Sequence, residues 1–208
     1  MSGFRPLAVL LLAVATTGGG RGGGGDALTP RAKGSPNAPV TVYEMADFQC
    51  PACRGFALTV LPTLEREFVA TSKVRWVFIN LPLPSVHRNA IPAAEAAMCA
   101  ARQGRFWQMH DLLFEHQTEW AGLAEAAPAL VALGVRAGAD RATLSACVAT
   151  RATRSEVEED ARLSARAGAR ATPSFYIEGG LLEGAPRTPE PFRVLLDSIY
   201  RAKSRRGP

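Results

Sequence analysis

Apolar side chains alternate along residues 40–48, whose sequence is VTVYEMADF. Every second position belongs to one face of an extended chain, and Glu44 is the acid on that face. The opposite face is not fully polar either, which is typical of a central strand that is covered on both sides. Residues 74–83 (VRWVFINLPL) are β-branched and aromatic and end at prolines, so they predict a second strand.

A helix is predicted between these two strands. It begins at the sequence CPAC, residues 50–53, where Pro51 suits the first helical turn, and Pro62 predicts a kink near its middle. A strand, a helix and a second strand in this order form a β-α-β unit, whose two strands run parallel.

The pattern then changes to helical spacing for a long stretch. Residues 85–171 contain no strand pattern and are divided by glycines into several predicted helices. The sequence SFYIEGGLLEG after them predicts a β-hairpin that turns at Gly179-Gly180, and residues 188–203 predict a final helix. The expected fold is an α/β domain, residues 39–204, with an all-helical insertion between its β-α-β half and its C-terminal ββα half.

The first residues have the pattern of a secretory signal. Arg5 precedes a short apolar run that ends in small side chains, and this run is shorter than the roughly 20 residues that cross a bilayer. We therefore expect a signal in residues 1–15, with a retained membrane anchor as the alternative. Residues 16–38 are rich in glycine and proline and predict a flexible linker that cannot form a dimerisation domain. The protein is expected to be a periplasmic or otherwise extracytoplasmic monomer.

The composition excludes little beyond this. The chain has 208 residues, of which 47% are hydrophobic and 21% charged, as in an ordinary globular domain. The net charge of +5 comes mostly from dispersed arginines. Aromatic residues are not interleaved with these arginines along one stripe, which argues against nucleic-acid binding.

Four cysteines, Cys50, Cys53, Cys99 and Cys147, carry the candidate chemistry, and four thiols can pair in three ways. A Cys-X-X-Cys sequence at the start of a helix places its first sulfur beside unsatisfied N–H groups and the positive end of the helix dipole, which favours the thiolate. The second cysteine, one turn further, can resolve a mixed disulfide. Cys50 and Cys53 therefore predict a redox pair; a zinc half-site and a purely structural local disulfide are the alternatives.

Two further positions indicate a site around this pair. Glu44 is an acid in an apolar strand, and a buried carboxyl group below a dithiol can shuttle the proton of Cys53; a carboxylate paired with an arginine is the alternative. Pro173 stands at the entrance to the first strand of the hairpin. Cis peptide bonds are rare even before proline, about 5–6% of cases, so spacing alone favours an ordinary strand-start proline there.

Several motifs, in this order, resemble the DsbA-like thiol:disulfide oxidoreductases, which have a thioredoxin fold. The motifs are FQCPAC after an acid-bearing strand, a long helical insertion after the second strand, and TPSFYIEGG followed by a C-terminal helix. The insertion itself, from LPLPSVHRNAIPAAEAAMC onwards, also resembles that of the family. The resemblance extends roughly from Ala38 to Lys203.

The resemblance implies a role for each site residue. Cys50 is implied to be the exposed sulfur that exchanges with substrates, Cys53 the buried resolving sulfur, and Glu44 the buried proton acceptor. Thr172-Pro173 is implied to be a cis peptide that faces the dithiol, with the Thr172 backbone pairing with an extended substrate strand. This overturns the interpretation of Pro173 that spacing alone favours.

Two features of the sequence depart from the family pattern. Arg170-Ala171 stands where the family often has glycine before the Thr-Pro pair, which predicts a stiffer and more basic loop. Pro51-Ala52 separates the cysteines, where strongly oxidising members often carry histidine, so weaker thiolate stabilisation is expected. The direction of electron flow is therefore open.

The sequence thus predicts an exported oxidoreductase that introduces disulfides through Cys50 and Cys53, with no metal, nucleotide or flavin cofactor. Its expected partners are unfolded or extended protein thiols and a membrane redox partner that resets the dithiol. A reductase or isomerase of the same fold is one alternative, and a non-catalytic peptide-binding module is another. The resemblance also implies a structural disulfide between Cys99 and Cys147; two free buried cysteines are the alternative.

Overall fold

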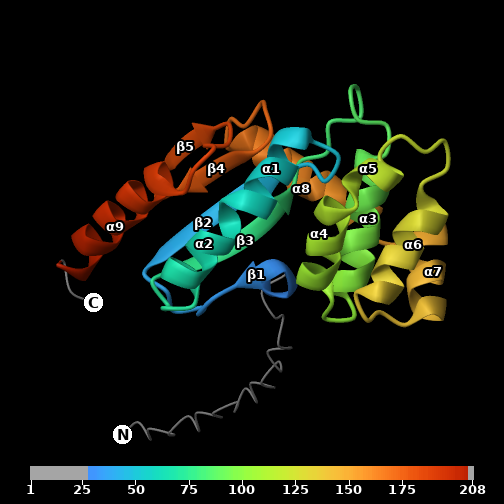
Figure 1. Cartoon of the computed structure of the whole chain (residues 1–208), viewed down its shortest axis with the longest axis horizontal. Helices are drawn as coiled ribbons and strands as arrows, with labels where there is room; N and C mark the ends of the chain where they lie inside the picture. The colour runs from blue at the N-terminus through green and yellow to red at the C-terminus, as the bar shows by residue number, and fades with distance from the viewer. Residues whose placement is uncertain (1–27, 206–208) are drawn as a thin grey trace, which may run out of the picture.

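A five-stranded sheet forms the centre of the computed structural model, which describes residues 28–205 (Figure 1). Its strands, in chain order, are β1 (Ala32–Lys33), β2 (Val40–Ala46), β3 (Val74–Asn80), β4 (Ser174–Ile177) and β5 (Gly180–Glu183). They lie in the order β1-β3-β2-β4-β5. β2 and β3 run parallel, whereas β4 is antiparallel to β2 and β5 is antiparallel to β4. The predicted β-α-β unit and C-terminal hairpin are therefore confirmed.

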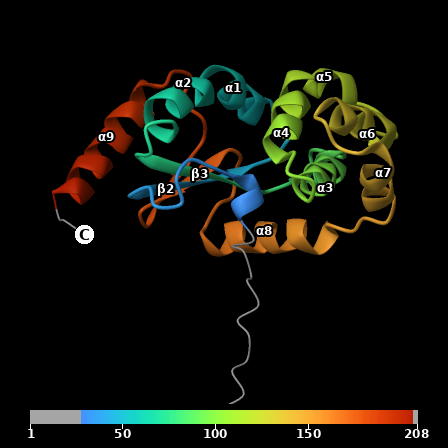
Figure 2. The ribbon, with the colours of Figure 1, turned by 90° about the horizontal axis from the view of Figure 1, so that it is seen from below.

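Helices cover both faces of the sheet and form a further layer beyond one end of it (Figure 2). One face carries α1 (Pro51–Thr59), α2 (Leu61–Leu64), a π-helical turn η2 (Glu65–Val69) and α9 (Glu190–Ser204), and the other carries α8 (Arg154–Arg166). The layer beyond the sheet contains α3 (Ala90–Ala101), α4 (Phe106–Glu115), α5 (Gln117–Trp120), α6 (Ala127–Arg136) and α7 (Arg141–Ala149). The predicted all-helical insertion between the two halves of an α/β domain is thus confirmed.

The predicted helix after β2 is broken into α1 and α2 at Val60. The break lies close to the predicted kink at Pro62, because a proline has no N–H to donate to the preceding turn. α1 is therefore a short helix whose first turn, at the cysteines, lies at the end of β2.

Two apolar layers hold the sheet to its helices. Because the side chains of a strand alternate, β2 contributes to both layers. The layer under α1, α2 and α9 contains Val42, Phe56, Trp76, Phe175 and Phe192. The layer on the side of α8 contains Met45, Val77 and Ile79.

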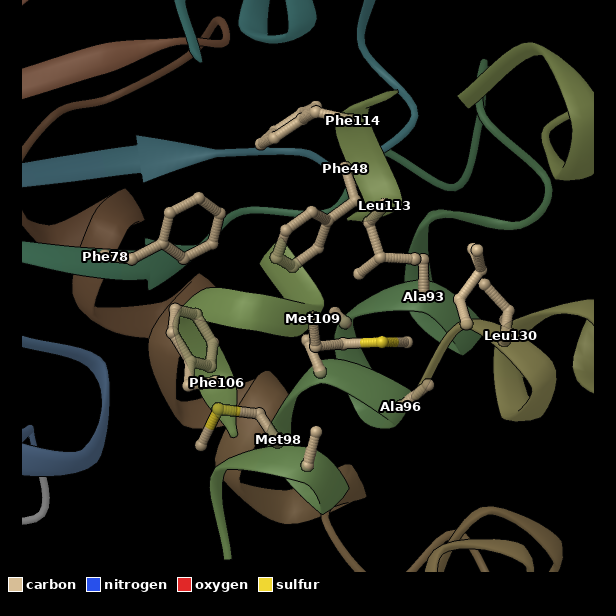
Figure 3. Close-up of a cluster of buried hydrophobic side chains, with 14 of the residues drawn as sticks. Phe48, Phe78, Ala93, Ala96, Met98, Phe106, Met109, Leu113, Phe114 and Leu130 are labelled. Carbon is tan, nitrogen blue, oxygen red and sulfur yellow. The ribbon is translucent and has the colours of Figure 1, made fainter. Parts of the chain in front are cut away.

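Aromatic side chains join the insertion to the end of the sheet (Figure 3). Phe48, which follows β2, stacks on Phe78 of β3 with ring centroids 4.8 Å apart, and Phe106 and Phe114 of α4 pack around them. Complete burial of such side chains stabilises a fold by about 1.5–3 kcal/mol each. The cluster therefore fixes the insertion against the segment that leads into Cys50.

A disulfide stabilises the insertion itself. Cys99 of α3 and Cys147 of α7 are joined, with their Cα atoms 5.9 Å apart. Around Cys99, a small apolar cluster with Leu144 and Ala139 fills the space between these helices.

The domain begins earlier than the predicted boundary at residue 39. The predicted signal, residues 1–15, and the first part of the predicted linker lie outside the described residues. Residues 28–38, in contrast, belong to the fold: a 3₁₀ turn, η1 (Thr29–Arg31), leads into β1, which pairs antiparallel with β3. The linker prediction is therefore corrected for residues 28–38.

Polar contacts hold this N-terminal segment in place. Arg31 is only 4% exposed and forms a bidentate ion pair with Asp160 of α8. Lys33 of β1 pairs with Glu65 at 2.5 Å. Such contacts leave no periodic pattern in a sequence. The linker prediction rested on glycine and proline content alone, so it was wrong for this segment. None of the helices between residues 28 and 205 is long and apolar enough to cross a membrane.

Candidate active site

Cys50 and Cys53 lie where β2 turns into α1. The N–H of Cys50 donates to the carbonyl of Asp47 at 3.0 Å, Cys50 is the N-cap of α1, and Pro51 occupies the first helical turn. Both cysteines are free thiols; Cys50 is 7% exposed and Cys53 is fully buried. Cys50 thus reaches the surface at the positive end of a helix, and Cys53 lies behind it.

The two thiols differ strongly in pKa. The pKa of Cys50 is lowered to about 5, chiefly by a hydrogen bond from the Cys53 thiol. Burial opposes this shift, whereas hydrogen bonds from Thr172 and from the N–H groups of Cys53 and Ala52 lower the pKa further. Burial raises the pKa of Cys53 well above its ordinary value, and both the hydrogen bond to Cys50 and the charge on Cys50 raise it further. At neutral pH the reduced site therefore holds a thiolate at Cys50 and a thiol at Cys53.

Glu44 is a completely buried acid on β2. Trp76 Nε1 donates a hydrogen bond to its Oε2 at 2.8 Å, whereas Oε1 has no hydrogen-bond partner among the described residues. Burial raises the pKa of Glu44 to about 7, and the Trp76 hydrogen bond and the charge of Lys33 offset only part of that effect. The partner of Glu44 is thus an indole, and the alternative of an arginine ion pair is not what the structure shows.

Glu44 and the inner thiol influence each other. The negative charge of Glu44 contributes to the raised pKa of Cys53. A carboxyl group that titrates near neutral pH beside a thiol of high pKa is suited to carry a proton to and from that thiol.

The Thr172-Pro173 peptide is cis and lies against Cys50. Sγ of Cys50 lies 3.4 Å from the carbonyl oxygen of Thr172, to which it can donate a hydrogen bond only in its protonated form. The sheet explains this contact between distant segments, because β4 begins at Ser174 and pairs there with Met45 of β2. The loop before β4 is therefore brought to the end of β2, where the cysteines lie.

The structure brings together Cys50, Cys53, Glu44, Thr172 and Pro173, but it does not bring Cys99 and Cys147 to the same place. Those two cysteines are bonded to each other between α3 and α7. Within residues 28–205, no group of three or more histidine, cysteine, aspartate and glutamate side chains is arranged to hold a metal ion.

Sequence reasoning missed the polar residues that hold the loops around Cys50. Gln117 of α5 donates from Nε2 to the carbonyl oxygen of Cys50 at 3.1 Å. The buried carboxylate of Asp47 contacts Nδ1 of His87 at 2.8 Å and so fixes the loop after β3. In the sequence, each is only a polar residue among apolar neighbours, and that pattern does not predict which loop its side chain contacts.

Comparison with known proteins identifies the family. The chain matches the thioredoxin family model over residues 26–198. Disulfide bond formation protein D of Bacillus subtilis is 26% identical over 169 residues, which are 74% of this chain and 72% of that protein. The chain therefore belongs to the thioredoxin family. The solved structures that it resembles include DsbA-type proteins, which have the same thioredoxin fold with a helical insertion.

Solved structures agree with this assignment of the fold. Oxidised BdbD of Bacillus subtilis superposes with a TM-score of 0.74 at 23% identity, covering 82% of this chain and 92% of that one. DsbA1 of Wolbachia pipientis (alpha-DsbA1) superposes with a TM-score of 0.73 at 20% identity, covering 85% and 93%. The predicted thioredoxin fold with a helical insertion is confirmed.

A relative of another kind matches much of the same domain. The Na(+)/H(+) antiporter NhaA 3 of Salinispora tropica is 37% identical over 148 residues, which are 71% of this chain and 21% of the antiporter. The chain thus spans about a fifth of the length of that curated relative, and the similarity concerns one segment of it.

Proposed function

We propose that this chain is a thiol–disulfide oxidoreductase that introduces disulfides into exported proteins through Cys50 and Cys53. The observation that carries the proposal is the opposite pKa shift of two adjacent thiols at a helix N-terminus. A sulfur that is stable as a thiolate is a good leaving group, and a buried thiol behind it can close a disulfide with it.

The reaction starts from the Cys50–Cys53 disulfide. A substrate thiolate attacks Sγ of Cys50, a substrate–Cys50 bond forms, the bond to Cys53 breaks, and Cys53 leaves with the electron pair and takes up a proton. A second substrate thiolate then attacks the substrate sulfur of the mixed disulfide, and Cys50 leaves as a thiolate. The substrate has lost two electrons and gained a disulfide, and the enzyme is left as the dithiol seen here.

Glu44 supplies the proton that Cys53 takes up. Because its pKa is raised to about 7, the Glu44 carboxyl group is protonated in a substantial fraction of the molecules at neutral pH. In the reverse direction, when the dithiol is oxidised again, the ionised carboxylate accepts the Cys53 proton. Glu44 thereby allows the inner thiol to react although its own pKa is high.

Thr172 and Pro173 form the edge at which an extended substrate lies. The carbonyl oxygen of Thr172 lies 3.4 Å from Sγ of Cys50, so a peptide that pairs with this backbone brings its own sulfur close to Cys50. Substrates are therefore unfolded or extended exported proteins, and a membrane redox partner withdraws the two electrons that the dithiol has gained.

The pKa of Cys50 supports oxidation over reduction as the direction of electron flow. The sequence predicts weak thiolate stabilisation because no histidine separates the cysteines, but Cys53, Thr172 and backbone N–H groups lower this pKa to about 5 without one. Stabilising the reduced form makes the disulfide a stronger oxidant.

Equilibration of the Cys50/Cys53 pair with glutathione tests the direction. A potential near −120 mV, about that of the strongest oxidants of this kind, is the expected result, and one near about −270 mV would make the protein a reductase. A Cys53→Ala variant tests whether exchange takes place at all. It should accumulate mixed disulfides through Cys50, and a variant that traps no protein while peptides still bind would indicate a non-catalytic module.

A further inference from the structure

Most arginines of residues 28–205 bond to a carboxylate, a carbonyl or an aromatic partner. The exceptions, whose side chains form no hydrogen bond, ion pair or ring contact within the described part of the chain, are Arg88, Arg141, Arg170, Arg187, Arg201 and Arg205. All of these side chains are exposed. Arg88, Arg170 and Arg187 come from separate loops, each of which contacts Cys50, the segment before it or the start of α1; we call them the arginine ring.

Arg170 belongs to the loop that contacts Cys50. It precedes by two residues Thr172, whose carbonyl oxygen lies 3.4 Å from Sγ of Cys50. The main chain of the loop is fixed, because the N–H of Arg170 donates to Oε1 of Glu183 at 3.0 Å. Arg170 is thus an exposed cation on an anchored loop whose main chain contacts the reacting sulfur.

Arg187, on the loop between β5 and α9, lies next to the first turns of α1. It lines a cavity of about 400 Å³ together with Pro186 and with Ala52 and Gly55 from the first turns of α1. Ala52 lies between the two cysteines, so this cavity opens directly beside the dithiol.

Arg88 is on the loop between β3 and α3, which projects at the same upper edge of the molecule as the start of α1 (Figure 1). Both of its neighbours are bonded to the segment that leads into Cys50. His87 contacts Asp47 at 2.8 Å, and the N–H of Asn89 donates to Oε1 of Gln49 at 2.8 Å. These bonds hold the Arg88 loop against the site.

Two acids, Asp47 and Glu183, are bonded to these loops. Asp47 is buried and accepts hydrogen bonds from main-chain N–H groups and from His87. Glu183 is the acceptor for the N–H of Arg170. None of the three guanidinium groups of the arginine ring forms an ion pair with a carboxylate of the described residues, so all three remain available to an acidic partner.

We propose that the arginine ring makes the face around Cys50 a docking surface for acidic polypeptide segments. Exported proteins with Asp or Glu close to the reacting cysteine would then be oxidised fastest. The inference rests on the proposed function and adds its substrate class. Exposed charges act mainly by steering the encounter, so the effect belongs to the bimolecular rate and disappears in high salt.

Two dithiol peptides test the proposal, one with Asp and Glu flanking its cysteines and one with Asn and Gln at the same positions. The second-order rate of oxidation by the oxidised protein is measured for each, and the preference is the ratio of the two rates. Comparing this ratio between protein variants cancels the intrinsic reactivity of the peptides. We expect the preference to be clear at about 0.01 M salt and to be lost at about 1 M salt.

The variants differ only in where the charge is removed. Arg88→Gln/Arg170→Gln/Arg187→Gln removes the arginine ring, and the control with Arg141, Arg201 and Arg205 changed to Gln removes the same charge from α7 and the end of α9, away from α1 (Figures 1 and 2). The ring variant should lower the preference about tenfold and the control should keep it. Denaturant midpoints report whether each variant is folded.

An unchanged preference in the folded ring variant, or an equal loss in the control, would overturn the proposal. Equal ratios at both salt concentrations would overturn it as well. If the unmodified protein oxidised neither peptide, the proposed function itself would fail, which is a different result from oxidation of both peptides without preference.

Discussion

The two cysteine pairs of this chain have the same chemical groups but different surroundings in the fold. Cys50 and Cys53 stand at the first turn of α1 as free thiols, whereas Cys99 and Cys147 are 48 residues apart and join α3 to α7. The first pair has N–H donors, a neighbouring carbonyl and a titratable acid around it. The second lies among apolar side chains of two helices.

The difference teaches what a reactive sulfur needs. When the disulfide opens, the thiolate at Cys50 is stabilised by the new thiol of Cys53, by Thr172 and by backbone N–H groups, so opening the bond costs little. Opening the Cys99–Cys147 disulfide produces no thiolate that the fold stabilises in this way, and it removes the constraint on a long loop. We therefore expect the first pair to control activity and the second to control stability.

Replacing Cys50 should separate the pairs most sharply. Cys50→Ser removes the sulfur that forms the mixed disulfide, so oxidation of a dithiol peptide should fall to the uncatalysed rate. The C99S/C147S variant should retain most of the activity in the same assay. A double variant as inactive as Cys50→Ser would show that the two pairs are not divided in this way.

Removing the second pair should have the next largest effect, and on a different quantity. Closure of a loop of 48 residues by a disulfide is worth about 4 kcal/mol in the chain-entropy model, a factor of about 10³ in the unfolding equilibrium. Denaturant unfolding of C99S/C147S against the unmodified protein measures it. Selective reduction of Cys50–Cys53 is the matched comparison, and it should not destabilise the protein at neutral pH.

Glu44→Gln should sharpen the contrast within the first pair. Without the acid that exchanges a proton with Cys53, we expect resolution of a mixed disulfide to slow about 10²-fold and its pH dependence near 7 to vanish. Stability should not fall: folding raises the pKa of Glu44 from 4.5 to about 7, so ionisation disfavours the folded state as the pH rises through this range.

Glu95→Gln is the control for this variant. Glu95 is also buried, but it pairs with Arg151 and Arg154 in the insertion. Its replacement should leave the rate of exchange unchanged. Slowed exchange in Glu95→Gln, measured by the same rapid-mixing experiment, would assign the effect of Glu44 to general loss of structure.

Acidification should produce the smallest of these effects. With a pKa of about 5, the thiolate fraction of Cys50 falls about tenfold between pH 7 and pH 4, and alkylation of the reduced protein should slow in proportion. Because folding lowers this pKa, the thiolate stabilises the reduced fold fully above pH 9, and that stabilisation is lost as the pH falls to about 5. An alkylation rate that does not change with pH would contradict the assignment.

Much of the fold and the reactive pair could be predicted from the sequence because both depend on short-range patterns. Alternating apolar residues define β2, and CPAC directly after that strand defines the start of α1. The acid on the inner face of β2 stands out for the same reason, since a carboxyl group is expensive to bury without a role. Each of these signals lies within a few residues.

What could not be predicted depends on contacts between distant segments. Spacing favoured an ordinary Pro173, and only resemblance to a family indicated the cis peptide that the structure contains. The ion pair of Arg31 with Asp160 spans more than half of the chain, so nothing in residues 28–38 announced that they belong to the domain. The low pKa of Cys50 likewise arises mainly from the arrangement of Cys53 and Thr172 and not from the side chains between the cysteines.

The hydrogen bond between Trp76 and Glu44 gives the protein an internal optical indicator. The indole N–H lies 2.8 Å from a carboxyl oxygen whose group titrates near pH 7, so a proton gained or lost there changes the electric field at the ring. Trp120, in contrast, donates to the carbonyl of Leu113, which does not titrate. Tryptophan emission can therefore report the ionisation of a carboxyl group that no solvent-borne reagent reaches.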